Sequence, residues 1–210
     1  MARNYAQYCA IARSLDVVGE RWALLVVREL VDGPRRYTDL LAGIPGVTRD
    51  MLADRLRNLE RDGVIHRAAL PDGSKGYELS DLGQELGPVL LTLTKWGLRV
   101  LGEQHEEDSF QARWLIHPLR AAFRRERAGD GAVTIRFDTG EQHLDVAISA
   151  GELSIVETGL EAPEVLVTAT AQTLAESWSD PAAQSDGRLR FTGSPEAIRK
   201  IQSAFGFPAA

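Results

Sequence analysis

The stretch Thr48–Gly63 constrains the fold most strongly, because it combines an apolar stripe with an arginine-bearing face. Leu52, Leu56 and Leu59 recur at i, i+4 and i+7, which predicts an amphipathic helix of about four turns. The opposite face carries Thr48, Arg49, Ala53, Arg57 and Arg61. Because such a helix anchors itself by its leucines and fits a duplex major groove with its other face, we expect it to bind DNA.

The net charge of −6 argues against nucleic-acid binding until its distribution is considered. Residues 1–105 hold 14 Lys+Arg and 14 Asp+Glu, whereas residues 106–210 hold 10 and 16. The acidic C-terminal half repels phosphates, so any DNA contact is expected in the N-terminal half. The length of 210 residues suits one large or two ordinary domains.

The chain is expected to reside in the cytoplasm and to make no membrane contact. Cys9 is the single cysteine, so no intrachain disulfide can form. No run reaches the roughly 20 apolar residues that a bilayer span needs, and the N-terminus lacks the layout of a signal peptide.

The order of elements in the first 80 residues is typical of a winged helix-turn-helix. The expected helices are Tyr8–Val18, Arg21–Leu30, Tyr37–Leu41 and the Thr48–Gly63 helix, with Thr48 as N-cap. Two short strands, Val64–Ala69 and Gly76–Leu79, flank a Pro-Asp-Gly turn. Two further helices are expected over Asp81–Gln104 and Phe110–Arg127, and Gly129 and Gly131 mark a boundary after them.

Beyond Gly131 the apolar period changes to two, which predicts strands. The expected strands are Val133–Phe137, His143–Ile148, Leu153–Val156, Val165–Ala169 and Arg188–Thr192. Helices are expected after Thr170 and from Pro195. The fold class is therefore α+β, with a mainly antiparallel five-stranded sheet in the C-terminal domain. The expected domains are 1–107 for DNA binding, 108–129 as a connecting or dimerisation helix, and 130–210 for ligand binding or dimerisation.

Residues 8–105 resemble the HxlR-type regulators, a winged-helix branch close to the MarR type. The matching motifs are Cys9, Gly19-Glu20-Arg21-Trp22, the run Leu30–Tyr37, Leu56-Arg57-Asn58-Leu59-Glu60, Tyr77–Gly83 and Trp96-Gly97. The resemblance implies a homodimer that binds double-stranded DNA and often acts as a repressor. We expect the dimer contact on the helices Asp81–Gln104 and Phe110–Arg127, together with Tyr5–Ala12.

The candidate DNA contacts fall into two groups. Arg35, Arg36, Arg67 and Lys75 are expected to contact phosphates. Thr48, Arg49 and Arg57 are expected to contact base edges. The alternative is a solvated face on which these arginines pair with Asp50, Asp54 and other carboxylates. Arg55 lies nearer the apolar stripe, so we expect it to form an intramolecular ion pair.

Residues 130–206 resemble the sterol carrier protein type 2 fold in the order and spacing of strands and helices. The resemblance implies a cavity for an apolar small-molecule effector. The candidate lining residues are Phe137, Ile148, Ile155, Leu174, Trp178, Phe191 and Phe205. The alternative is that these side chains simply fill the core.

The sequence gives weaker signals for redox sensing, catalysis and metal binding. Cys9 is either a redox sensor, as in some similar regulators, or a buried structural residue on the apolar side of its helix, which we favour. The four histidines lack metal-ligand spacing, and no phosphate loop or GxSxG motif occurs, so we expect no catalysis, cofactor or metal. Two rivals stay open: a lipid carrier whose winged helix binds protein, and a regulator whose acidic domain only supports dimerisation.

Overall fold

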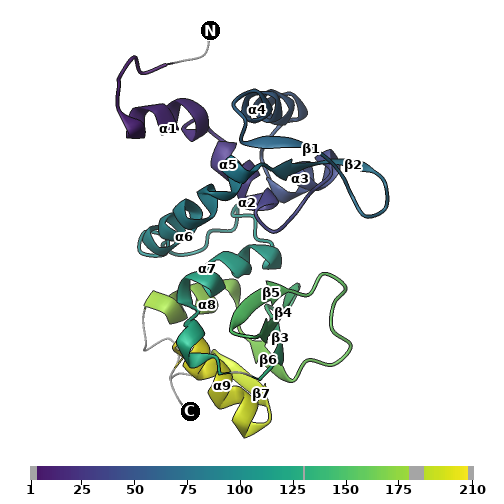
Figure 1. The fold of residues 1–210 in the computed structure, drawn as a ribbon. Helices are drawn as coiled ribbons and strands as arrows, with labels where there is room; N and C mark the ends of the chain where they lie inside the picture. Colours follow the sequence, from purple (N-terminus) through teal and green to yellow (C-terminus); the bar gives the residue numbers. More distant parts are fainter. Residues whose placement is uncertain (1–3, 130, 180–186, 208–210) are drawn as a thin grey trace. The chain divides into compact units, whose positions relative to one another are not determined.

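The computed structural model describes residues 4–129, 131–179 and 187–207, without the side chains of residues 178 and 179. Figure 1 shows the ribbon. Contacts divide the chain into two compact units, residues 1–90 and 91–210. Each unit has its own cluster of buried apolar side chains, so each is described by itself.

The first unit is built mainly from helices. They are α1 (Ala10–Val18), α2 (Ala23–Leu30), α3 (Tyr37–Gly43), α4 (Arg49–Arg61) and α5 (Asp81–Gln84). Val26 and Val27 of α2 are fully buried, and Leu52, Leu56 and Leu59 of α4 pack in the same cluster. The predicted central helix and the predicted leucine stripe are therefore confirmed.

The predicted hairpin follows α4. Its antiparallel strands are β1 (Ile65–Ala69) and β2 (Lys75–Leu79). The Arg35 N–H donates to the Tyr77 carbonyl oxygen at 2.9 Å, and the Tyr77 N–H donates back at 2.8 Å, so Arg35 extends the hairpin by one bridge. A Cβ at position 76 would lie 2.6 Å from the Arg35 carbonyl oxygen, which explains Gly76 at this crossing. The first unit is a winged helix-turn-helix, as predicted.

The single helix predicted over Asp81–Gln104 is divided and shortened in the structure. α5 ends at Gln84, and α6 runs over Leu86–Gly97, across the division between the units. Pro88 explains the break, because it has no N–H and its ring clashes with the carbonyl of Gln84, four residues earlier. Beyond α6 the chain continues in turns, and Gly102 adopts a left-handed φ of 70°.

The second unit is built on a five-stranded sheet with the order β5-β4-β3-β6-β7. The strands are β3 (Val133–Asp138), β4 (His143–Ser149), β5 (Glu152–Ile155), β6 (Val165–Thr168) and β7 (Arg190–Gly193). The prediction of a mainly antiparallel sheet was wrong: the sheet is mixed, because the neighbouring strands β3 and β6 are parallel. Residues 156–164 carry the chain from the edge strand β5 to β6. Strand direction is invisible to a period of two, since parallel and antiparallel strands alternate alike.

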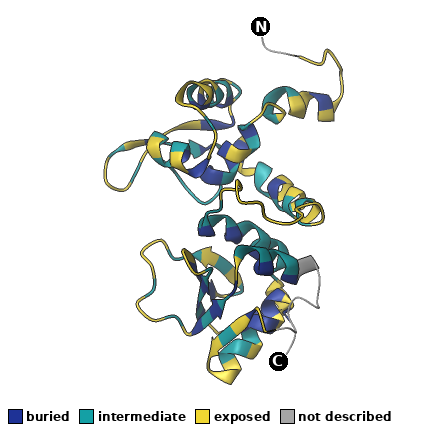
Figure 2. Ribbon diagram, turned by 180° about the vertical axis from the view of Figure 1, so that it is seen from behind, coloured by how far each residue is buried: buried dark blue, intermediate teal, exposed yellow. Residues whose placement is uncertain are grey.

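Helices cover the apolar face of this sheet. They are η1 (Ala112–Leu115), α7 (Ile116–Ala122), η2 (Arg125–Arg127), α8 (Ala171–Ser179) and α9 (Pro195–Phe205). Val133, Ile135 and Phe137 alternate inward along β3 and pack in one cluster with Leu119 of α7 and Ile201 of α9. Figure 2 colours these buried residues dark blue.

The helix predicted over Phe110–Arg127 is also interrupted. Its first turn is the 3-10 turn η1, α7 ends at Ala122, and Phe123 is extended with ψ of 128°. Pro118 accounts for the tight first turn, because it cannot donate to the carbonyl of Trp114. No helix among the described residues is long and apolar enough to cross a membrane.

Candidate nucleic-acid interface

α4 begins with a capped first turn and exposes a polar face to solvent. The Thr48 hydroxyl accepts a hydrogen bond from the Met51 N–H at 3.3 Å, so Thr48 is the N-cap that the sequence predicts. The leucine stripe is buried, whereas Thr48, Arg49 and Arg57 are exposed. The three predicted base contacts therefore point away from the core of their unit.

A hydrogen bond ties α3 to the start of α4. The Tyr37 hydroxyl, in the first turn of α3, donates to the Arg49 carbonyl oxygen at 2.8 Å. This bond fixes the N-terminus of α4 against the helix that precedes it. The side chain of Arg49 is left exposed.

A buried ion pair positions the other end of α3. Arg28 and Glu29 pair at 2.8 Å, and Arg28 Nη2 also donates to the Gly43 carbonyl oxygen at 3.0 Å. Burial lowers the pKa of Arg28, although Glu29 opposes the shift. A Cβ at position 43, the last residue of α3, would lie 2.6 Å from Glu29 Oε2, so a side chain there would displace the carboxylate that Arg28 holds. The sequence does not reveal this support, because two adjacent charges in an apolar helix form no recognisable spacing pattern.

The hairpin of β1 and β2 is the wing, and one aspartate orders the turn at its tip. Asp72 Oδ1 accepts from the Ser74 N–H at 3.0 Å and from the Ser74 hydroxyl at 2.7 Å, which closes an Asx turn. Arg36 forms an ion pair with Asp72, and its Nε donates to Ser74 Oγ at 2.8 Å. The hydrogen bonds from Ser74, reinforced by Arg36, hold the pKa of Asp72 below its ordinary value. The Pro-Asp-Gly-Ser sequence signals the turn but not its link to Arg36.

The predicted phosphate and base contacts differ in how they are paired. Three arginines have carboxylate partners: Arg36 with Asp72, Arg57 with Asp54, and Arg67 with Glu60. Arg67 also lies over the Tyr77 ring, 5.0 Å from its centroid. Within the described residues, Arg49 and Lys75 form no ion pair and are exposed. Arg35 is half-buried, and its main chain is used by the bridge to the wing.

The expectation for Arg55 is confirmed. Its side chain is only 13% exposed and pairs with Glu20 at 3.5 Å. Asp54, which weighs against DNA binding, is held by Arg57 on the same helix face.

The residues predicted to line an apolar cavity lie in the core of the second unit. Phe137, Ile148, Leu174 and Phe205 are buried there, while Ile155 and Phe191 pack against it. The Phe137 and Phe205 rings meet edge to face, with centroids 6.0 Å apart. None of these six lines the large pocket of this unit, which lies near the C-terminal end of α6. The side chain of Trp178 lies outside the described residues.

Cys9 is exposed rather than placed on the apolar side of a helix. α1 begins one residue later, at Ala10, and Cys9 is extended at its N-cap with φ of −141° and ψ of 131°. The expectation of a buried position depended on a helix that starts at Tyr8.

Comparison with known proteins adds to this geometry. Residues 17–105 match the family described as HxlR-like helix-turn-helix. The chain is 36% identical to YdeP of Bacillus subtilis over 91 residues, covering 42% of this chain and 71% of YdeP. It is 31% identical to YvaP of the same organism over 96 residues, covering 44% of this chain and 89% of YvaP.

A third similar protein comes from Synechocystis. It is 38% identical over 103 residues, covering 48% of this chain and 76% of that protein. All three relatives are named uncharacterized HTH-type transcriptional regulators. With a winged helix-turn-helix at the matched residues, the chain belongs to the HxlR-like helix-turn-helix family.

Proposed function

We propose that the protein is a sequence-specific transcriptional regulator that binds double-stranded DNA as a homodimer and acts as a repressor. The observation that carries the proposal is the exposed face of α4 together with a wing that carries Arg67 and Lys75, in a chain of a regulator family. In this proposal α4 enters the major groove, where Thr48, Arg49 and Arg57 contact base edges. Arg35, Arg36, Arg67 and Lys75 contact the flanking phosphates.

The ion pairs at this surface are compatible with DNA binding. The side chains of Arg57 and Arg67 are 67% and 61% exposed, and surface pairs of this kind are worth about 0–1 kcal/mol. A phosphate can therefore replace Asp54 or Glu60 as the partner at small cost. Arg49 and Lys75 have no such partner to lose among the described residues.

Exposed apolar side chains support the homodimer. One set lies in and before α1: Tyr5, Tyr8, Ile11 and Leu15, exposed by 42% or more. The other set lies on α5, on α6 and just after it: Leu82, Val89, Leu93, Trp96 and Val100. Large apolar side chains exposed along one stretch of chain are typical of interaction surfaces, so a second copy is the proposed cover. Two reading helices then meet half-sites roughly 34–36 Å apart.

The second unit is proposed to carry the control of DNA binding by a small molecule. In keeping with its resemblance to the sterol carrier protein type 2 fold, we expect an effector with a large apolar part. An effector alters DNA affinity only if it prefers one of two dimer states, and couplings of about 1–3 kcal/mol are typical.

The test is DNA selection followed by titration. A random duplex pool is selected on the full-length protein, and fluorescence anisotropy then measures affinity for the selected site and a scrambled site at several salt concentrations. We expect Arg49→Gln to lower the affinity for the selected site at least about tenfold and to reduce the preference for that site over scrambled DNA. Lys75→Gln should weaken both sites and lower the salt slope by about one unit per protomer.

Arg199→Gln is the matched control. Arg199 is exposed on α9 in the second unit and makes no ion pair among the described residues, so it should leave both affinities unchanged. Wild-type affinity in Arg49→Gln and Lys75→Gln would contradict the proposed interface. Absence of any selected site would favour the carrier alternative.

A further inference from the structure

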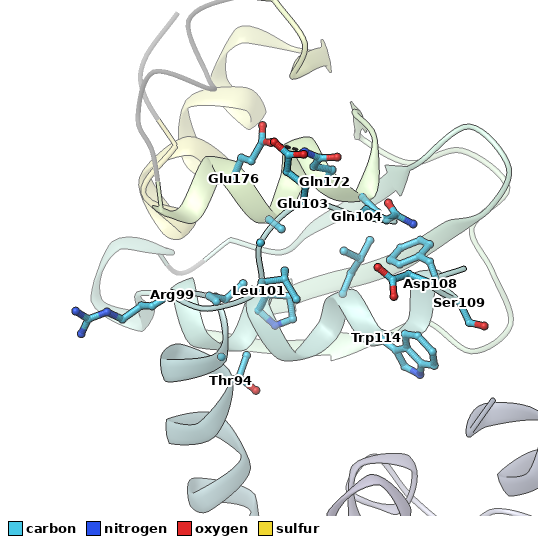
Figure 3. A pocket seen from close by; sticks show the side chains of 18 residues that line it. Thr94, Arg99, Leu101, Glu103, Gln104, Asp108, Ser109, Trp114, Gln172 and Glu176 are labelled. Atoms are coloured by element: carbon cyan, nitrogen blue, oxygen red, sulfur yellow. Dashed lines mark hydrogen bonds between the residues drawn. The ribbon is translucent and has the colours of Figure 1, made fainter. Parts of the chain in front are cut away.

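The second unit contains a pocket of about 810 Å3 that is separate from its aromatic core. All its described lining residues fall between Thr94 and Glu176, within residues 91–210. They come from the end of α6, the following turns, η1, the start of α7, and α8, as Figure 3 shows. Its volume lies within the range of about 300–1,000 Å3 that is usual for small-molecule sites.

Two anchors hold the walls of the pocket. Gln142 donates from Nε2 to the Phe110 carbonyl oxygen at 3.2 Å and accepts at Oε1 from the Ala112 N–H at 3.0 Å. This clamp fixes the segment that carries Phe110 and leads to Trp114. On α8, Gln172 Nε2 donates to Glu176 Oε1 at 2.8 Å, which orients the carboxylate. These polar contacts therefore hold two walls of the pocket in place.

The lining is largely apolar and is open to solvent. Phe110 and Trp114 contribute two aromatic rings, and Leu115 forms a buried part of the wall. Leu101 also lines the pocket and is 61% exposed, so apolar surface faces water where a ligand would cover it. Ala171 and Ala175 leave room along α8.

Carboxylates outnumber cations among the charged side chains that line the pocket. The described lining holds three carboxylates, Glu103, Asp108 and Glu176, against one cation, Arg99. Arg188 pairs with Glu176 at 2.9 Å, and Asp108 accepts from the His105 N–H at 2.8 Å. Glu103 forms no ion pair among the described residues. Negative charge beside aromatic rings favours a cation with an apolar body and disfavours an anion of equal size.

We propose that this pocket binds a lipophilic organic cation, with Glu103 as its charge partner and Phe110 and Trp114 as its aromatic contacts. The inference names the chemistry of the effector proposed above, and it rests on that proposed function only for the consequence on DNA. Binding is measured without DNA, so failure of the pocket can be distinguished from failure of the regulatory role.

The test uses two ions that match in shape and differ in charge. Isothermal titration calorimetry of the full-length protein measures tetraphenylphosphonium and tetraphenylborate separately. We expect saturable binding of the cation, and at least about tenfold weaker binding of the anion. Equal affinity for both ions, or no saturable binding of the cation, would overturn the proposal.

Variants locate the binding to the pocket. Glu103→Gln should lower the affinity for the cation about fivefold. Glu106→Gln removes the same charge from an exposed residue of the same segment outside the lining, and should change the affinity less than twofold. Ala175→Phe should narrow the cavity along α8 and weaken binding of the cation, with circular dichroism confirming that the variant is folded. Equal effects of the two glutamine variants, or wild-type binding by a folded Ala175→Phe, would exclude this pocket as the site.

Discussion

Arg136 of β3 and Asp145 of β4 form a two-point ion pair, with Nε to Oδ1 and Nη2 to Oδ2 distances of 2.7 Å each. The Asp145 side chain is 2% exposed, and Oδ2 also accepts from the Leu160 N–H at 2.7 Å. Arg136 Nη2 donates to the Leu160 carbonyl oxygen at 2.6 Å. Through Leu160, the pair therefore holds the connection between β5 and β6 against β3 and β4. This connection leads the chain into the parallel pairing of β6 with β3.

Asp145→Asn should destabilise the second unit by about 2–4 kcal/mol, because it leaves Arg136 without its charged partner in a largely buried place. Urea denaturation followed by circular dichroism measures the change. Glu152→Gln on β5 is the control, since Glu152 belongs to an exposed pair at 3.7 Å and should cost little. Similar losses in both variants would contradict the structural role of Asp145.

The same pair predicts a pH dependence of stability. The hydrogen bonds from Arg136, assisted by Leu160, lower the pKa of Asp145 in the folded state. Between the unfolded pKa, about 3.9, and the lower folded pKa, the unfolded chain binds more protons. The contribution of Asp145 is thus present above pH 4 and is lost as pH falls through the folded pKa. Urea midpoints of wild type and Asp145→Asn should converge as pH is lowered from 6 towards 2, and a constant difference would contradict this assignment.

Asp72→Asn should strengthen DNA binding about two- to threefold at low salt, because it releases Arg36 from its ion pair and removes a charge that repels phosphate. The asparagine oxygen can still accept from Ser74, so the turn should persist. Fluorescence anisotropy against the selected DNA measures the gain. Glu85→Gln makes the same change in net charge at an exposed position outside the wing, and an equal gain there would mean that Arg36 is not involved.

Gly43→Ala should destabilise the first unit by about 1–3 kcal/mol, because the added Cβ meets Glu29 while Arg28 holds that carboxylate in place. Thermal denaturation measures the loss. Gly87→Ala is the matched control, since its nearest neighbour outside the helix lies at 3.8 Å and ordinary van der Waals contact is expected. An unchanged melting temperature in Gly43→Ala would show that Glu29 moves aside freely.

Ile11→Glu should weaken the proposed homodimer at least about tenfold without unfolding the protomer, because Ile11 is 72% exposed and a buried, unpaired carboxylate is costly. Sedimentation velocity across a concentration series measures the association. Met51→Glu adds the same charge at an apolar position on α4 that is 42% exposed and outside the two apolar sets. If both variants dimerise equally well, α1 does not belong to the interface.

The amino-acid sequence was sufficient for most of the first unit. α4 begins one residue after the predicted N-cap Thr48, and its leucine stripe is buried as the i, i+4 and i+7 spacing predicted. Caps, turns and helical periodicity act over a few residues, so they are visible in a local stretch of sequence. The interruptions of the two long predicted helices also have a local cause in the sequence. Pro88 and Pro118 each lack an N–H, and this outweighed the apolar spacing that predicted continuous helices.

Other features were decided only by the tertiary structure. Alternating residues predicted the strands, but the parallel pairing of β3 with β6 depends on where residues 156–164 lead the chain. The link from Arg36 to Asp72 joins residues 36 positions apart, and the clamp of Gln142 on Phe110 spans 32. Aromatic residues that suited a cavity pack against one another, and the pocket lies instead between segments whose sequences show no common pattern. Local sequence determines which element forms, whereas the partner of each side chain is determined by the contacts that compete for it once the chain is compact.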